Sequence, residues 1–375
     1  MHPVYAIAAH IVSPLGLDTQ SHWQAVMAGR TGIKRYEDQA LSNTPFMASK
    51  LDTGQWHTIQ TPTNKQQLSP FEQLATFSAQ KAIDQLEDYI DLQQTVFILA
   101  TTKGNIELLG QVPDERMLLH HPAHIIADQL DIPNKPVVIS QACVSGVVAL
   151  QYGMRLLQQG RYKHAVVCGC DRFSRFVLSG FQSFQAVSDE ACRPFDAERK
   201  GITLGEAAAT IILSVDKPTN TLGQLTGGAT SNDANHISGP SRTGEELAAA
   251  ISSAIDEANI TPAQIDMISA HGTATIYNDE MEAKAFDVAG ISNAPLHSFK
   301  GYIGHTLGAA GVLESAMILE SIRHQILIPS IGYNTSGVSK DINVTQQAQA
   351  ANINHVLKTA SGFGGSNAAI IWKKV

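Results

Sequence analysis

The sequence predicts an α/β protein made of two similarly built halves. Short apolar runs rich in β-branched residues alternate with stretches of helical spacing, which is the pattern of a sheet covered by helices. The chain has 375 residues, more than one ordinary core contains. Its 43% of hydrophobic and 16% of charged residues are typical of a well-buried globular protein. We place the boundary in the polar stretch SVDKPTNTLG, so that the halves are residues 1–216 and 217–375.

The first half contains a predicted strand, helix and strand in sequence. Apolar residues recur at steps of three and four from Val147 to Leu157, and Gly160 follows where a helix C-cap belongs. The predicted strands, all short and rich in β-branched residues, are TVFILA (Thr95–Ala100), KPVVIS (Lys135–Ser140) and KHAVVCG (Lys163–Gly169). The last two strands and the helix form one βαβ unit.

The second half repeats this order. A helix is predicted over Asn278–Ala289, because acidic residues lie near its start and Gly290 follows its end. The predicted strands are IDMISA (Ile265–Ala270), PLHSF (Pro295–Phe299) and AAIIW (Ala368–Trp372). The segments Asp38–Asn64 and Asp189–Lys200 have the least regular pattern, and we expect surface loops or a cap there.

Composition excludes several classes of function. The net charge is −8 and no block of Lys and Arg is present, so nucleic acid is not an expected partner. No apolar run approaches the roughly 20 residues that cross a bilayer, and the first residues lack the basic start of a signal peptide. We therefore expect a cytoplasmic protein without membrane contact. The four cysteines, which have no zinc-site spacing, are expected to be free thiols: Cys143, Cys168, Cys170 and Cys192.

Cys143 lies where a predicted strand turns into a predicted helix. Unpaired N–H groups at a helix start carry partial positive charge, so we expect a lowered thiol pKa and a reactive thiolate. The small residues Ser145 and Gly146 leave room for a ligand beside the sulfur. The alternative is a small apolar residue packed at a strand end, which is our interpretation of Cys168 and Cys170.

Two histidines also follow predicted strands, where α/β proteins collect groups that face a ligand. They are His271 in SAHGTAT (Ser269–Thr275) and His305 in FKGYIGHTLGAAG (Phe299–Gly311). A zinc site needs further ligands at suitable spacing, and no H-x-x-x-H or C-x-x-C pair is present, so no metal is expected. We expect four other histidines to be structural residues without a part in the site: His120, His121, His124 and His355.

A glycine loop, SGFGGSN (Ser361–Asn367), leads into the last predicted strand. A phosphate-binding loop would open a helix instead, so we expect these glycines to let backbone N–H groups approach a ligand. One thiol, two imidazoles, Lys300 and backbone donors together make a site suited to acyl transfer.

Six segments in the same order resemble the β-ketoacyl-acyl-carrier-protein synthases, which are condensing enzymes of the thiolase-like superfamily. The other segments are KPVVIS with SQACVSG, RPFDAERKGITLGEAAA (Arg193–Ala209) and SNDANHISGP (Ser231–Pro240). The resemblance runs from about residue 5 to residue 373 and is to the Cys-His-His elongating type. It implies a thiolase-like fold with a five-layered αβαβα body. The half 1–216 would carry the nucleophile, and the half 217–375 both catalytic histidines.

The resemblance implies roles for the residues that match the family's motifs. Cys143 would take the acyl group as a thioester, and its N–H and that of Phe363 would form the oxyanion hole. His271 and His305 would promote decarboxylation of a malonyl unit, because two imidazole N–H donors can stabilise an enolate oxygen by a few kcal/mol each. Lys300 would pair with Glu314 and set the field around His305.

Further residues would support this site. Thr273 and Thr275 would hold the pantetheine arm, and Phe363 with Gly364 would line and gate the acyl pocket. Asp279 and Glu282 match acids behind the His271 loop, although a helix start explains them equally well.

The same resemblance implies the partners. The substrates would be carried on the phosphopantetheine arm of acyl carrier protein, with no metal or organic cofactor. The protein would be a homodimer, or a heterodimer with a homologous ketosynthase-like chain. Candidate docking residues for the acidic carrier are Arg35, Lys65, Lys200 and Arg242.

Substrate and rival functions stay open at this point. Lys103 and Glu107 replace glycine-rich and apolar residues of the family near the chain-length region, so a fatty acid and a specialised polyene or polyketide chain are both possible. A thiolase needs a second catalytic cysteine late in the chain, and none follows Cys192. A chain-length factor is a non-catalytic partner that typically lacks the nucleophile. A cysteine hydrolase would leave His305 and Lys300 without a role.

Overall fold

The structure is a computed structural model that describes residues 2–59, 67–111, 114–235 and 237–375. The helices of the described residues are α1 (Thr19–Met27), α2 (Thr53–Ile59), α3 (Pro70–Ile83), α4 (His120–Gln129), α5 (Ser145–Gln158), α6 (Arg175–Ser183), α7 (Glu245–Glu257), α8 (Ile276–Val288), α9 (Lys300–Ile303) and α10 (Ala310–His324). The strands are β1 (Val4–Val12), β2 (Ile33–Tyr36), β3 (Phe46–Ser49), β4 (Thr95–Ala100), β5 (Val137–Ile139), β6 (His164–Asp171), β7 (Leu204–Gly205), β8 (Ala207–Ser214), β9 (Gly223–Asn232), β10 (Met267–Ser269), β11 (Leu296–His297), β12 (Ile326–Leu327), β13 (Gln349–Ala350), β14 (His355–Gly362) and β15 (Ser366–Lys373).

Ten of the described strands join in one mixed sheet. Their order is β11-β10-β14-β15-β9-β1-β8-β6-β4-β5, so each half supplies five neighbouring strands. The halves meet where Val4, Tyr5 and Ala6 of β1 pair with β9. Within each half the buried strands are near-continuous apolar runs, as expected of a sheet with helices on both faces.

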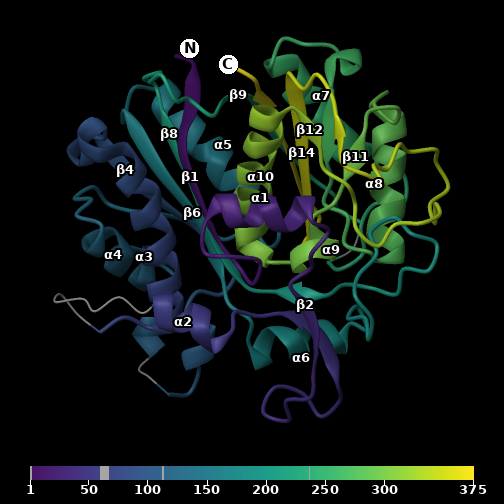
Figure 1. The fold of residues 1–375 in the computed structure, drawn as a ribbon, viewed down its shortest axis with the longest axis horizontal. Helices are drawn as coiled ribbons and strands as arrows, with labels where there is room; N and C mark the ends of the chain where they lie inside the picture. Colours follow the sequence, from purple (N-terminus) through teal and green to yellow (C-terminus); the bar gives the residue numbers. More distant parts are fainter. Residues whose placement is uncertain (1, 60–66, 112–113, 236) are drawn as a thin grey trace.

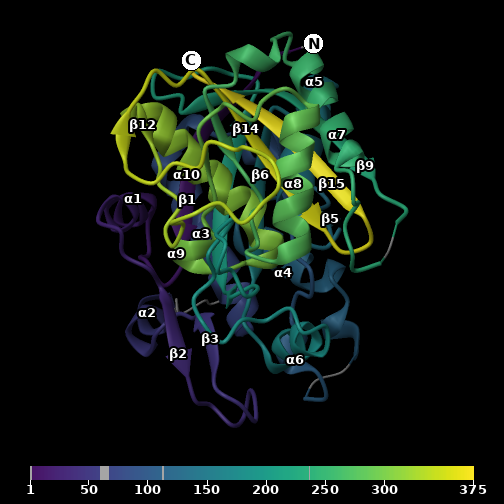
Figure 2. The same cartoon turned by 90° about the vertical axis from the view of Figure 1, so that its right-hand side faces the viewer.

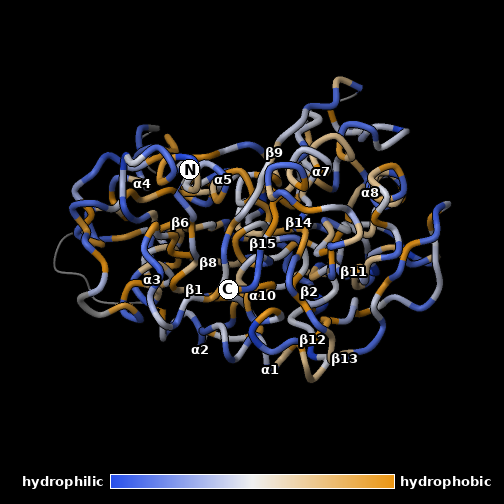
Figure 3. The backbone as a smooth tube through the Cα atoms, turned by 90° about the horizontal axis from the view of Figure 1, so that it is seen from above, coloured by the Kyte–Doolittle hydropathy of each residue, from blue (hydrophilic) through white to orange (hydrophobic). Residues whose placement is uncertain are grey.

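The layers follow from which helices contact which strands. In the middle, α5 and α10 touch strands of both halves, whereas α3 and α4 cover the outer face of the first half and α7 and α8 that of the second (Figure 1). The five-layered αβαβα body expected from the sequence is confirmed. Seen from above, hydrophobic stretches concentrate in the interior and hydrophilic ones at the periphery (Figure 3).

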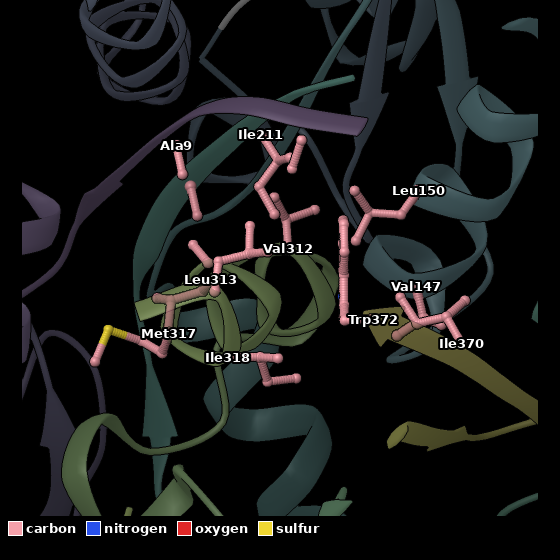
Figure 4. Close-up of a cluster of buried hydrophobic side chains, with 14 of the residues drawn as sticks. Ala9, Val147, Leu150, Ile211, Val312, Leu313, Met317, Ile318, Ile370 and Trp372 are labelled. Carbon is pink, nitrogen blue, oxygen red and sulfur yellow. The ribbon is translucent and has the colours of Figure 1, made fainter. Parts of the chain in front are cut away.

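The central core lies between the two halves of the sheet. Val312, Leu313 and Ile318 of α10 pack among side chains of both halves, including Leu150 of α5 and Trp372 of β15 (Figure 4). Trp372 is fully buried. Burying a large apolar side chain contributes about 1.5–3 kcal/mol, so this layer holds the two halves, and the loops at their strand ends, in a fixed relation.

Most expected elements are present with shifted ends. The strand at Thr95–Ala100 is β4 without change, and the predicted helix and its glycine cap correspond to α5 and to Gly160, whose φ is +70°. The expectation that Asp38–Asn64 is irregular is wrong in part. β3 and α2 lie in it, because β3 pairs with β2 and with the distant β7; residues 60–64 lie outside the described residues. Asp189–Lys200 contains no helix or strand, as expected.

A second, smaller sheet lies outside the ten-stranded one. The small sheet β2-β3-β7, with α2 and α6, lies at one end of the molecule, away from both termini (Figure 2). Among the described residues, every helix is too short or too polar to traverse a bilayer.

Candidate active site

Cys143 lies on a tight turn between β5 and α5. Ala142 before it adopts a left-handed conformation with φ +46°, which is unfavourable outside glycine and turns the chain sharply. The hydroxyl of Ser145 stabilises the turn: it donates to the Ala142 carbonyl at 2.6 Å and accepts the Gln141 N–H at 2.8 Å. The thiol is therefore presented beside the first turn of α5, with 8% of the residue exposed.

His271 follows β10 in a loop held by a buried carboxylate. The N–H groups of His271 and Gly272 donate to Glu282 of α8 at 2.8 and 2.6 Å. Thr359 of β14 donates to the same carboxylate at 3.0 Å. Glu282 is thus a loop anchor, and the alternative of a plain helix start does not account for its complete burial.

His305 is positioned by its backbone and by one ring nitrogen. Its N–H donates to the Thr203 carbonyl at 2.7 Å, and its Nδ1 accepts the Leu307 N–H at 3.4 Å. An accepting Nδ1 places the proton of the neutral ring on Nε2. Among the described residues this buried Nε2 has no hydrogen-bond partner, so it is a donor available to a ligand.

These three side chains meet although 128 residues separate Cys143 from His271 (271 minus 143). One ligand atom of each of Cys143, His271 and His305 lies within 4.8 Å of the others. The two rings are 5.0 Å apart between centroids and nearly perpendicular, at 84°. The sequence predicted that these three side chains lie together, and their distances agree with that prediction.

Behind the rings lies a buried carboxylate between two lysines. Glu314 of α10 contacts Lys300 at 2.6 Å and Lys358 at 2.5 Å, and all three side chains are buried. Burial acts to raise the pKa of Glu314, but the two lysines outweigh it and the pKa is lowered. Lys300 was predicted from the sequence and Lys358 was missed. The signal for Lys358 is a lysine in an apolar strand, HVLKTASG, that has buried neighbours on both sides.

The surroundings keep both imidazoles neutral. Burial lowers the pKa of His271 and of His305 well below 6.5, and the charges of Lys300 and Lys358 lower both further. A neutral ring retains one N–H donor and releases no proton during binding. Both rings can therefore donate a hydrogen bond to a developing negative charge at neutral pH.

The expectation that the pKa of the Cys143 thiol is lowered is wrong. Burial raises the pKa of this thiol to about 12, with Lys300 acting in the opposite direction. Desolvation of the thiolate outweighs the helix N-terminus, since the sulfur is enclosed by the loops of both halves. The thiol must lose its proton during reaction rather than before it.

A cavity of about 370 Å³ leads to the three side chains and is lined mainly by apolar groups. Phe363 at its wall is 38% exposed and packs against Phe181 of α6 and Phe184 just after that helix, each with ring centroids 5.5 Å away. Thr273 and Thr275 face the same cavity with their hydroxyl oxygens 2.9 Å apart. Phe181 and Phe184 were not predicted from the sequence, because no local pattern indicates where α6 lies.

The glycine loop brings the C-terminal half against Cys143. A Cβ on Gly362 would lie 3.1 Å from the Cys143 nitrogen, so the chain approaches closely there. Gly364 has φ +86° and donates its N–H to the Ile237 carbonyl at 2.7 Å. This loop places Phe363 at the cavity beside the nucleophile turn.

The remaining predicted residues are more scattered. Asp279 is buried, accepts the Phe195 N–H at 2.7 Å and lies 3.7 Å from Arg199, which makes it a structural anchor. Of the candidate docking residues, Lys200 lines the cavity and pairs with Glu190 at 2.5 Å. Arg35 and Arg242 are exposed elsewhere, and Lys65 lies outside the described residues, as does residue 236 in the segment Ser231–Pro240.

The chain is similar to condensing enzymes throughout its length. Residues 1–218 match the family model for the N-terminal domain of beta-ketoacyl synthase, and residues 222–334 match that for its C-terminal domain. A protein of Rhizobium meliloti (strain 1021) named 3-oxoacyl-acyl-carrier-protein synthase 2 is 28% identical over 423 residues, covering 100% of this chain and 99% of that protein.

Polyketide proteins are also among the relatives. A putative polyketide beta-ketoacyl synthase 1 of Streptomyces cyaneus is 30% identical over 262 residues, which are 66% of this chain but only 62% of that protein. A solved structure, the ishigamide ketosynthase/chain length factor, superimposes with a TM-score of 0.88 at 25% identity and covers 100% of this chain and 99% of that one. With two family models matched in order and this fold, the chain belongs to the β-ketoacyl synthase family.

Proposed function

We propose that the protein is a β-ketoacyl-acyl-carrier-protein synthase, an acyltransferase that condenses an acyl thioester with a malonyl unit. The observation that carries the proposal is the meeting of Cys143, His271 and His305 within 4.8 Å at the end of a mainly apolar cavity. The thiol supplies a nucleophile, the two rings supply neutral N–H donors, and the apolar wall suits an acyl chain.

The first half-reaction transfers the acyl group. The Cys143 sulfur attacks the thioester carbonyl, the S–C bond to the carrier breaks, and the carrier thiol leaves with the proton that Cys143 loses. The N–H groups of Cys143 and Phe363, both at the cavity, hold the oxyanion of the tetrahedral intermediate. Because the resting thiol has a raised pKa, approach of the thioester and proton transfer occur together.

The second half-reaction forms the carbon–carbon bond. Loss of CO₂ from the malonyl thioester leaves an enolate, whose oxygen accepts hydrogen bonds from His271 and from Nε2 of His305. The enolate carbon then attacks the acyl thioester on Cys143, and the sulfur leaves as the thiolate. Each donor in such a site is worth about 3–4 kcal/mol, so the pair stabilises the enolate by several kcal/mol.

Acyl transfer to Cys143 is tested by intact-protein mass spectrometry. After incubation with acyl-carrier donors, the wild-type protein gains the mass of one acyl group, whereas Cys143→Ala gains none and still decarboxylates the malonyl thioester. A Cys143→Ala variant that still gains the acyl mass refutes the assignment. The same experiment across chain lengths and degrees of unsaturation distinguishes fatty acid from polyene or polyketide substrates.

The proposed partners are acyl carrier protein and a second chain of the same family. The name of the Rhizobium relative includes the carrier protein, and the ishigamide structure pairs a ketosynthase with a chain length factor. A homodimer and a heterodimer are distinguished by the mass of the purified protein in solution, alone and with a co-expressed homologous chain. We also propose the cytoplasm as the location, because the four cysteines are free thiols.

The second candidate function is that of a non-catalytic chain-length factor. The likeness to a ketosynthase/chain length factor structure is the observation that favours it. The complete Cys-His-His set favours catalysis, since a subunit without turnover needs none of the three. We propose that no metal or organic cofactor takes part. The Cys-His-His set could hold zinc, but the positive charges of Lys300 and Lys358 behind the rings oppose a divalent cation.

A further inference from the structure

Lys358 is a buried lysine of β14 whose ammonium group contacts four oxygen atoms. Its Nζ lies 2.5 Å from Glu314 Oε2 and 2.6 Å from the Thr359 carbonyl. It also donates to the carbonyls of Ser269 and Ala270 at 3.2 and 3.4 Å. These last two carbonyls immediately precede His271, so the lysine binds the segment that carries this ring.

The four contacts indicate the charged form of the amine. Each of these oxygen atoms accepts and none donates, so three N–H groups of an ammonium all find partners. A neutral amine has only two N–H groups for these four oxygens and would turn its lone pair toward another acceptor in a buried place. Glu314, which also binds Lys300, supplies the opposite charge.

We propose that Lys358 is a positioning residue that, together with Lys300 and through Glu314 and the carbonyls before His271, holds both catalytic rings in the neutral, donating form. This inference rests on the proposed function, because it concerns the decarboxylation step. It assigns to Lys358 a role beyond packing: the ammonium fixes the end of β10 and adds a second positive charge behind the rings.

The charged and titratable groups around Lys358 come from several elements. Their charges together set the pKa values of His271 and His305. These groups are Lys300 of α9, Glu314 of α10, Glu282 of α8, His297 of β11, and the two rings themselves. Removing Lys358 takes away one of two cations and leaves both carboxylates. The pKa values of His271 and His305 then rise, and protonation removes their catalytic form at a higher pH.

The test compares Lys358→Met with the wild type in two reactions, malonyl-CoA decarboxylation and acyl transfer to Cys143. We expect decarboxylation at neutral pH to fall by about tenfold or more, as for other residues that orient catalytic groups. Its acid limb should move to higher pH, while acyl transfer changes less. Lys284→Met is the matched control, because Lys284 pairs with Glu280 at 3.2 Å on the surface and its loss gives the same change in net charge.

A direct readout of the rings does not depend on turnover. In protein labelled at histidine Cε1, the NMR signals of His271 and His305 should begin to titrate at higher pH in Lys358→Met. Failure of the wild-type protein to transfer acyl groups or to decarboxylate malonyl-CoA would refute the proposed function. The titration would still test the effect of Lys358 on the two rings. An unchanged titration, with both reactions lowered equally, would overturn the inference and show a purely structural role.

A variant of opposite sign covers the case in which Lys358→Met does not fold. Glu314→Gln removes the carboxylate that partly offsets the charges of Lys300 and Lys358, so titration of His271 and His305 should begin at lower pH. A shift to higher pH would contradict the proposal. Methylammonium added to Lys358→Ala should restore part of the decarboxylation rate, and tetramethylammonium, which lacks N–H donors, should not; equal effects of the two cations would also contradict it.

Discussion

Gly146, in the first turn of α5, allows the closest approach of the two central helices and is a sensitive point for both stability and catalysis. A Cβ at this position would lie 2.9 Å from each of three backbone atoms, the Gly308 oxygen and the Gly311 nitrogen and Cα. Backbone atoms cannot rotate away, so Gly146→Ala must push α5 from the start of α10. Overpacking of this kind costs about 1–3 kcal/mol, and the helix propensity of alanine returns only about 1 kcal/mol.

We therefore expect Gly146→Ala to lower the free energy of unfolding by up to about 2 kcal/mol, measured by urea denaturation. Since Cys143 precedes Gly146 and His305 precedes Gly308, the sulfur and the ring should also separate, and condensation should slow more than stability alone explains. Gly180→Ala on α6 is the control, because nothing lies within 4 Å of its Cβ and alanine should stabilise the helix there. A Gly146→Ala protein as stable and active as the wild type would refute this packing argument.

Three further predictions concern the reacting groups. Because burial raises the pKa of Cys143 to about 12, its alkylation by iodoacetamide should still accelerate with pH above about pH 9, and a plateau at neutral pH would contradict this. His305→Ala removes one N–H donor and should lower malonyl decarboxylation by about 100-fold while Cys143 still accepts an acyl group; equal loss of both reactions would remove the distinct role of this ring. Removal of divalent metal ions with EDTA should leave condensation unchanged, because Lys300 and Lys358 oppose a divalent cation beside the two rings; activity that requires zinc would refute the metal-free mechanism.

Local sequence patterns predict the elements whose burial is uniform. β4 has its predicted ends because all six residues are buried between helical layers, so its apolar run is complete. Local patterns do not predict β3, because Phe46–Ser49 is short and one of its partners, β7, begins at Leu204. A pairing across about 150 residues leaves no mark in the local pattern.

The residues of the site were predictable, but not the electrostatics. Cys143 and His271 each follow a strand and His305 follows the short helix α9, all in glycine-containing segments, and the combined motifs indicate acyl transfer. The sign of the shift in the Cys143 pKa was not predictable, because the helix N-terminus is a local feature and desolvation is not. Burial of this sulfur depends on segments such as Gly362 and Phe363, more than 200 residues further along the chain.

The sequence alone could also have indicated that Lys358 is buried and paired with a carboxylate. In a strand with one face in water, a lysine at an alternate position is ordinary. β14 lies between β10 and β15 inside the sheet, with Leu357 and Thr359 buried on either side, so no face of it is open to solvent. A lysine there needs a carboxylate and carbonyl partners, and Glu314 is an acid in an equally apolar helix. Two opposite charges within buried elements thus indicate a pair in contact, and the surplus cation, Lys300, indicates that this charge cluster serves the adjacent rings rather than stability alone.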